Sequence, residues 1–185
     1  MSRINPNSGP IVHPSPTAKA KTEEPASSAS DRIFAVTGMR LDDGRGNWVE
    51  LHIIGYQFPD FDWRRGMWDA NWLIIEGGAA LDGRRWNFRD PSLTTSEASD
   101  LATWLDHAAE GQAKGEVNFT EPNLAFGPLT NRQGIYVKLA NESRPPWIED
   151  LDGTEVRLAV TGDQLTSAAA AIRSELRGFP WRGPA

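Results

Sequence analysis

The sequence predicts an α+β fold: a largely antiparallel, twisted sheet of about eight strands with two helices packed on it, in the order strands, helix, strands, helix. Three observations lead to this prediction. Short runs of alternating apolar and polar residues dominate the chain from position 32 onward. Asp-Gly pairs stand between several of these runs, and such pairs favour tight turns between antiparallel strands. Two longer segments carry apolar residues at helical spacing.

The strands before the first helix are predicted from three runs. Apolar and polar residues alternate in 49–53 and in 86–88, which places the apolar ones on one face of each strand. The run 72–75 is apolar throughout, as expected for a central strand that is covered on both faces. Asp43-Gly44 precedes the first of these runs, and Asp82-Gly83 lies between the other two. Both residue types tolerate the positive φ that a two-residue hairpin turn requires.

Each helix is predicted from its capping signals. The first begins at Thr94, because Glu97 follows three residues later and the two can form a capping box. An apolar stripe follows, and Gly111 ends the helix. The second begins at Asp163, carries a similar stripe, and ends at Gly178.

The strands between the two predicted helices show the same alternation of apolar and polar residues. Apolar residues alternate with polar ones in 117–119, 135–139 and 156–160. Asp152-Gly153 lies before the last of these runs and predicts a further hairpin. The repeated turn signals are the reason for expecting mainly antiparallel pairing.

The chain divides once. Residues 1–30 are rich in Pro, Ser and Ala and contain few large apolar residues, so this segment is expected to be a disordered tail. Residues 31–185 are expected to form a single α+β domain. The tail through Asp31 has three basic and three acidic residues. The folded part therefore has 16 basic and 22 acidic residues and carries the whole net charge of −6.

Composition excludes several function classes. The absence of cysteine excludes disulfides, thiolate metal sites and cysteine nucleophiles. With three histidines, one of them in the tail, a histidine metal centre or a serine–histidine triad is not expected. The acidic charge argues against nucleic acid and anionic membranes as partners. We find no membrane-spanning run and no signal peptide, so we expect a cytoplasmic protein without a cofactor.

A search for catalytic motifs finds no phosphate loop, no His-Glu-x-x-His and no Gly-x-Ser-x-Gly. An enzyme is therefore not expected. One alternative is a small carbohydrate-active enzyme or sugar-binding module, with Trp platforms and paired carboxylates. The carboxylates available to it are Glu121, Glu142, Asp60, Asp62 and Asp69. The last three can also be read as oxygen ligands of a hard cation, or as a solvated acidic loop.

Tryptophan is the outlier of the composition, with eight residues beside two tyrosines. Three of them lie in periodic elements and are expected in the core: Trp72, Trp86 and Trp104. Trp63 and Trp68 lie in the loop 58–69 among Arg and Asp residues, a composition typical of interface hot spots. Alternatively, both rings fold back over the sheet edge. Trp147 and Trp181 follow prolines and are expected to anchor stiff segments to the body.

An ordered series of motifs runs through the folded part: GYQFP at 55–59, DANWL at 69–73, WNFRDPSLTTSE at 86–97, WL at 104–105, FTEPNLAF at 119–126, ESRPPW at 142–147 and FPWR at 179–182. This series resembles the WapI family of bacterial immunity proteins over about residues 51–182. The resemblance implies a protective partner of a polymorphic toxin, without enzymatic activity. It implies no particular binding residues. Within the motifs, Asp69, Asn71 and Glu142 are expected to be buried polar anchors.

Together these observations predict a cytoplasmic immunity protein that neutralises a cognate secreted or contact-delivered bacterial toxin by stoichiometric binding. An acidic inhibitor would be steered toward a basic toxin such as a nuclease. The predicted partner-binding residues lie in two loops: Asp60, Asp62, Trp63 and Trp68 in the first, and Glu149, Asp150 and Asp152 in the second. If neither loop binds the partner, the strand face with Glu50 and His52 is the next candidate. A structural domain without any toxin is a third interpretation.

Overall fold

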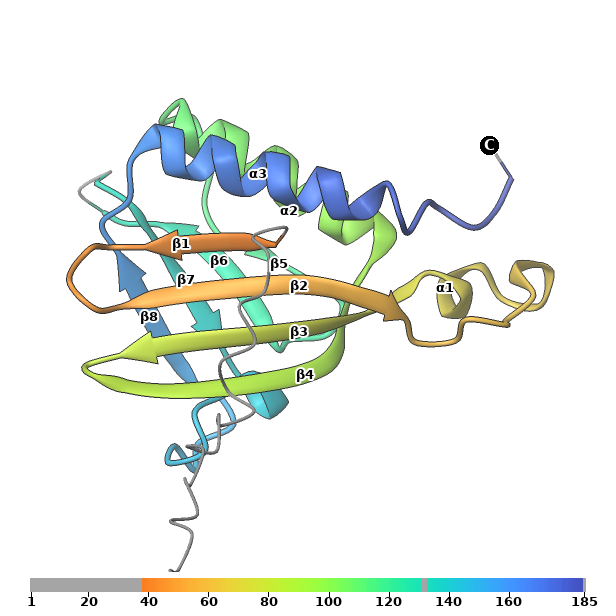
Figure 1. The fold of residues 1–185 in the computed structure, drawn as a ribbon, viewed down its shortest axis with the longest axis horizontal. Helices are drawn as coiled ribbons and strands as arrows, with labels where there is room; N and C mark the ends of the chain where they lie inside the picture. Colours follow the sequence, from red (N-terminus) through yellow and green to blue (C-terminus); the bar gives the residue numbers. More distant parts are fainter. Residues whose placement is uncertain (1–37, 131–132, 185) are drawn as a thin grey trace, which may run out of the picture. The chain divides into compact units, whose positions relative to one another are not determined.

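Two four-stranded antiparallel sheets and two long helices make up the part of the chain that the computed structural model describes, residues 38–130 and 133–184 (Figure 1). The predicted disordered tail, 1–30, lies outside these residues. The predicted order of strands, helix, strands and helix is confirmed. None of the helices in the described part is long and apolar enough to cross a membrane.

The first sheet has the order β1-β2-β3-β4. Its strands are β1 (Met39–Asp42), β2 (Trp48–Tyr56), β3 (Trp72–Leu81) and β4 (Arg84–Thr94). The predicted two-residue turn at Asp82-Gly83 joins β3 to β4, whereas the connection from β1 to β2 is a longer loop, 43–47, and not the two-residue hairpin expected at Asp43-Gly44. In the two-residue turn Asp82 has φ 51° and Gly83 has φ 80°, the left-handed conformations that the pair favours.

The second sheet has the order β5-β6-β7-β8. Its strands are β5 (Val117–Asn118), β6 (Leu124–Pro128), β7 (Ile135–Leu139) and β8 (Thr154–Leu158). Asp152-Gly153 ends a longer connection between β7 and β8 and is not a two-residue hairpin. Gly153 has φ 71° and approaches β7 so closely that a Cβ there would lie 1.9 Å from the Leu139 carbonyl oxygen.

The prediction of one sheet of about eight strands is therefore wrong in its arrangement. Hairpin signals report only which strands pair with their neighbours in sequence. A 15-residue helix separates β4 from β5, and no local pattern states whether β5 continues the first sheet or begins a new one.

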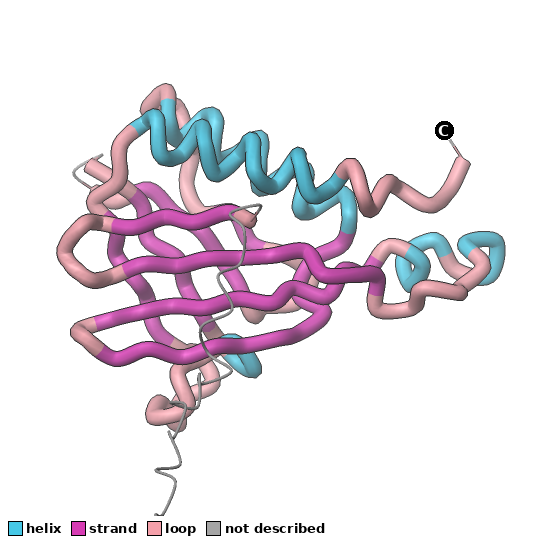
Figure 2. Tube along the Cα trace, viewed as in Figure 1, coloured by secondary structure: helices cyan, strands magenta, loops and turns pink. Residues whose placement is uncertain are grey.

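Helices α2 (Thr95–Ala109) and α3 (Gly162–Leu176) pack against each other, and α3 runs along β1 (Figure 1). The predicted capping box of Thr94 and Glu97 is present at the start of α2. At α3 the N-cap is Thr161, which forms a capping box with Gln164, so the predicted start at Asp163 is two residues late. Figure 2 shows further short helical turns in the connections, which the sequence did not predict.

The core is one hydrophobic cluster that takes buried side chains from both sheets and from α2 and α3. Trp86 and Trp104 belong to it, as predicted. Trp147 packs edge-on against Trp86 with ring centroids 5.4 Å apart, which confirms its anchoring role. Trp72 is only half-buried and lies outside the cluster, although β3 is a central strand. An antiparallel sheet packs one face on the core, and Trp72 lies on the other.

Candidate partner-binding surface

The connection between β2 and β3, residues 57–71, projects beyond the end of the first sheet (Figure 1). We call it the arm. A hydrogen bond from the Gln57 backbone N–H to the Trp72 carbonyl oxygen, 2.8 Å, closes its base. Beyond the base, the arm contains one 3-10 turn, Trp63–Arg65, and the short helix α1 (Met67–Ala70). Asp62 caps the 3-10 turn, because its carboxylate accepts from the Arg64 backbone N–H at 3.0 Å.

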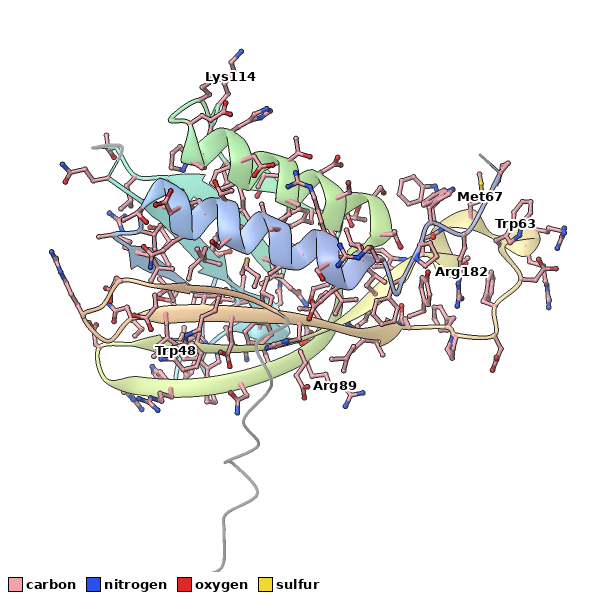
Figure 3. The ribbon with its side chains drawn as sticks, turned by 45° about the horizontal axis from the view of Figure 1, so that its top comes forward. Trp48, Trp63, Met67, Arg89, Lys114 and Arg182 are labelled. Atoms are coloured by element: carbon pink, nitrogen blue, oxygen red, sulfur yellow. The ribbon has the colours of Figure 1, made fainter. Side chains whose placement is uncertain are left out.

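The C-terminal segment, residues 178–184, lies against the arm (Figure 3). Asn71 connects the two. Its Nδ2 donates to the carbonyl oxygens of Met67, at 2.7 Å, and Arg182, at 2.8 Å. Its Oδ1 accepts from the Arg182 backbone N–H at 2.7 Å. Asn71 is fully buried, and its hydrogen bonds fix the position of the C-terminal segment relative to the arm.

The side chain of Arg182 makes a second connection. Its Nη1 donates to the Phe58 carbonyl oxygen at 3.1 Å, and its guanidinium lies 3.5 Å from the centroid of the Tyr56 ring. The Tyr56 hydroxyl donates to the Pro180 carbonyl oxygen. The Tyr56 ring also meets Phe179 edge-on with centroids 5.6 Å apart. The C-terminal segment is thus fixed to both ends of the arm.

The arm is also tied to the first turn of α2. The Asn71 carbonyl oxygen accepts from the Thr95 backbone N–H at 2.9 Å and from the Thr95 hydroxyl at 3.3 Å. Of the three motif residues expected to be buried anchors, only Asn71 is buried; Asp69 and Glu142 are exposed. A carboxylate is costly to bury without a paired charge, whereas a neutral amide can satisfy its donors and acceptor within this junction.

Exposed apolar side chains gather on this unit. Six large apolar side chains are exposed among the described residues, and four of them lie on the arm or the C-terminal segment: Phe58 at 42%, Met67 at 44%, Trp68 at 64% and Trp181 at 42%. We call these four the tip cluster. A Cβ placed on Gly183 would lie 2.6 Å from Trp181 Nε1 and 3.4 Å from Met67 Sδ, so these two side chains meet around Gly183.

Trp181 was expected to anchor its segment, and this expectation is wrong. Its ring is exposed, and its neighbour Arg182 makes the anchoring contacts. No signal in the sequence identifies the partner of Arg182, because Asn71 is 111 positions away.

The predicted partner-binding residues of the first loop all lie on the arm. Asp60, Asp62 and Trp68 are exposed, and Trp63 is half-buried. Asp62 forms an ion pair with Arg64 at 3.4 Å, and the Arg64 guanidinium lies 4.8 Å from the centroid of the Trp63 ring. Neither Trp63 nor Trp68 is part of the core cluster.

The predicted residues of the second loop lie elsewhere. Glu149, Asp150 and Asp152 are exposed on the connection between β7 and β8, where the Asp150 carboxylate accepts from the Asp152 backbone N–H at 3.0 Å. In Figure 1 this connection lies below β4, whereas the arm extends to the right of the sheet. The structure therefore does not bring the two predicted groups together. Leu151, 59% exposed, lies among these acidic residues.

The carboxylates considered for other chemistry form no metal centre. Within the described ranges, no group of three or more His, Cys, Asp or Glu residues is placed to hold a metal ion, so Asp60, Asp62 and Asp69 do not converge on a cation. Burial, together with the nearby Glu142 carboxylate, raises the pKa of Asp90 above its ordinary value. Glu121, also considered for sugar chemistry, is exposed.

The remaining candidate, the strand face with Glu50 and His52, contacts a helix. His52 Nδ1 lies 3.4 Å from the carboxylate of Glu175 on α3, and the other oxygen of that carboxylate accepts from the Ile53 backbone N–H at 2.9 Å. The hydrogen bond to Glu175 raises the pKa of His52 above its ordinary value. This pair joins α3 to β2 and so has a structural role.

Comparison with known families gives one match. The model of the family described as "Immunity protein WapI-like family" matches residues 40–180. This range includes both sheets, both long helices and the whole arm, and it ends immediately before Trp181. No curated protein and no solved structure matches the chain.

Proposed function

The chain belongs to the immunity protein WapI-like family, and we propose that it protects a bacterial cell by binding a cognate toxin stoichiometrically. Family membership indicates an immunity function and a protein partner, and immunity proteins are generally non-enzymatic. The observation that carries the proposal is the extent of the match, which spans the fold from β1 into the C-terminal segment.

We place this activity in the cytoplasm, where it would meet a toxin of the polymorphic class that is secreted or delivered by contact. The partner-binding residues proposed are the two exposed loop groups: Asp60, Asp62, Trp63 and Trp68 on the arm, and Glu149, Asp150 and Asp152 between β7 and β8. Loops suit this role because they can vary without disturbing the core that positions them.

The charge of the chain supports a basic toxin, such as a nuclease. The net charge is −6, and all five acidic residues proposed for binding are exposed. Complementary charge raises the association rate and disfavours partners with the same sign of charge.

Co-expression tests the proposal. The probe is the C-terminal domain of a large secreted protein encoded beside the gene for this chain, expressed in a host that it kills. We expect the chain to restore growth and to elute with that domain as a one-to-one complex. A toxin domain from an unrelated system is the matched control and should remain lethal. Continued killing by the neighbouring toxin, without a complex, would overturn the proposed function.

A further inference from the structure

The tip cluster combines two properties that are seldom found together on a surface. Its four side chains are large, apolar and exposed, and their backbone is held by the hydrogen bonds of one buried side chain, Asn71. Single exposed apolar residues are ordinary, but an exposed apolar patch marks an interaction site. Tryptophan in particular is enriched among the residues that contribute most to binding energy.

We propose that the tip cluster is the anchor that this chain inserts into an apolar hollow on its toxin; this inference rests on the proposed function. The anchor is composite, because Phe58, Met67 and Trp68 come from the arm and Trp181 comes from the C-terminal segment. Trp181 is therefore a partner-binding residue that the loop-based proposal does not include.

The hydrogen bonds between Asn71, Met67 and Arg182, which we call the Asn71 junction, give this anchor a fixed shape. The Asn71 side-chain amide binds α1 and the C-terminal segment at once, and the Asn71 carbonyl oxygen binds the start of α2. Ordering loops and side chains on association costs free energy, and a surface that is already ordered avoids part of that cost. A pre-ordered apolar projection suits a concave partner surface.

The charges around the cluster and on the whole chain indicate which kind of partner it meets. On the arm, Asp62 and Arg64 pair with each other. The arm and the C-terminal segment together have as many arginines as carboxylates, so the rim of the cluster carries both signs of charge without a net excess: Asp60, Asp62 and Asp69, with Arg64, Arg65 and Arg182. An apolar centre with a charged rim fits an apolar hollow with a polar border. The net charge of −6 on the whole chain favours a basic toxin as the occupant, whereas a second copy of this acidic chain would bring like charges together.

The experiment compares alanine variants of exposed apolar residues in the full chain. Trp68→Ala and Trp181→Ala remove two members of the cluster, and Ile54→Ala, at an exposed apolar position of β2 outside both proposed loops, is the matched control. We expect each tryptophan variant to bind the toxin domain encoded beside the gene about 30-fold more weakly, mainly through faster dissociation. The Ile54 variant should bind within about twofold of wild type.

Melting temperatures verify that each variant folds, and we expect them to match wild type because the replaced side chains are exposed. Met67→Lys places a charge in the cluster without removing a tryptophan and should weaken binding in the same way. If one tryptophan variant melts early, the Met67 variant supplies the test.

The outcomes separate the two proposals. If wild-type chain neither binds nor protects, the proposed function fails and the anchor fails with it. If wild-type chain binds and the Trp68, Trp181 and Met67 variants bind equally well, only the anchor is overturned. Sedimentation of the free chain tests whether the cluster binds a second copy of the chain instead of the toxin. Self-association that Trp68→Ala abolishes, with toxin binding unchanged, would also overturn the anchor.

Discussion

Asn71 and Arg182 exchange two hydrogen bonds although 111 positions separate them in the chain: Asn71 Nδ2 donates to the Arg182 carbonyl oxygen, and Asn71 Oδ1 accepts from the Arg182 backbone N–H. An amide side chain thus pairs with a backbone unit much as a neighbouring strand would. Arg182 itself contacts Phe58 and Tyr56. This one buried residue therefore determines where the C-terminal segment and the arm meet.

Replacement of Asn71 by alanine should lower the free energy of unfolding by about 2 kcal/mol or more, because it leaves buried backbone groups without partners. Urea denaturation measures this loss. Asn87→Ala, at an exposed position of β4, is the control and should change the free energy of unfolding by no more than about 0.5 kcal/mol. Equal midpoints for the two variants would show that the junction does not stabilise the fold.

The β3–β4 turn should require its glycine. Gly83 has φ 80°, so Gly83→Val forces a β-branched residue into the left-handed region at a cost of roughly 1–3 kcal/mol. Gly55→Ala is the comparison, since Gly55 lacks a left-handed φ and a Cβ there would have no neighbour within 4 Å. We expect thermal melting to separate the two variants. A Gly83 variant as stable as the Gly55 variant would contradict the turn assignment.

The His52–Glu175 pair should make stability depend on pH above the acidic range. The hydrogen bond to Glu175, aided by the charges of Glu50 and Glu76, raises the pKa of folded His52 above 6.5. The folded chain then keeps a proton that the unfolded chain has already lost. The stabilisation that this pair gives the fold is fully present below pH 6.5, the pKa of His52 in the unfolded chain. It is lost as the pH rises through the higher pKa of His52 in the folded chain.

Urea denaturation at about pH 6 and about pH 8 tests this linkage. Wild-type chain should lose more stability over this interval than His52→Gln. Glu175→Gln removes the carboxylate and should flatten the dependence in the same way. Parallel pH profiles for all three proteins would show that the pair has no energetic role.

Charge reversal on the two loops should separate their roles in association. Asp60→Lys should slow association with the toxin several-fold at low salt, and the difference should shrink at high salt because ions screen exposed charges. Glu149→Lys makes the same change on the second loop. Association rates from stopped-flow mixing at two salt concentrations compare them. A larger effect at Glu149 than at Asp60 would move the interface toward the β7–β8 connection.

The elements that the sequence predicts correctly are those specified by neighbouring residues. Thr94 and Glu97 lie within one turn, and their capping box is present. The alternation around Trp86 and Phe88 reports burial because a strand exposes successive side chains to opposite faces. At α3, the Thr161–Gln164 pair is an equally local signal, and it marks the start of the helix where Asp163 does not.

The features that the sequence does not predict depend on contacts between distant segments. Trp68 and Trp181 stand in sequence contexts like those of the core tryptophans, and only the fold shows that both are exposed, on the arm and on the segment that lies against it. The division into two sheets likewise depends on how α2 returns the chain to the core. Periodicity identifies the buried face of an element but not the element that covers it.

Hydrogen exchange on the chain alone and in complex with the toxin domain tests most directly whether the arm and the C-terminal segment form the toxin-binding surface. The account predicts that backbone N–H groups of residues 66–71 and 181–183 exchange more slowly in the complex than in the free chain. Unchanged exchange in these two segments, together with new protection on another face of the molecule, would contradict it.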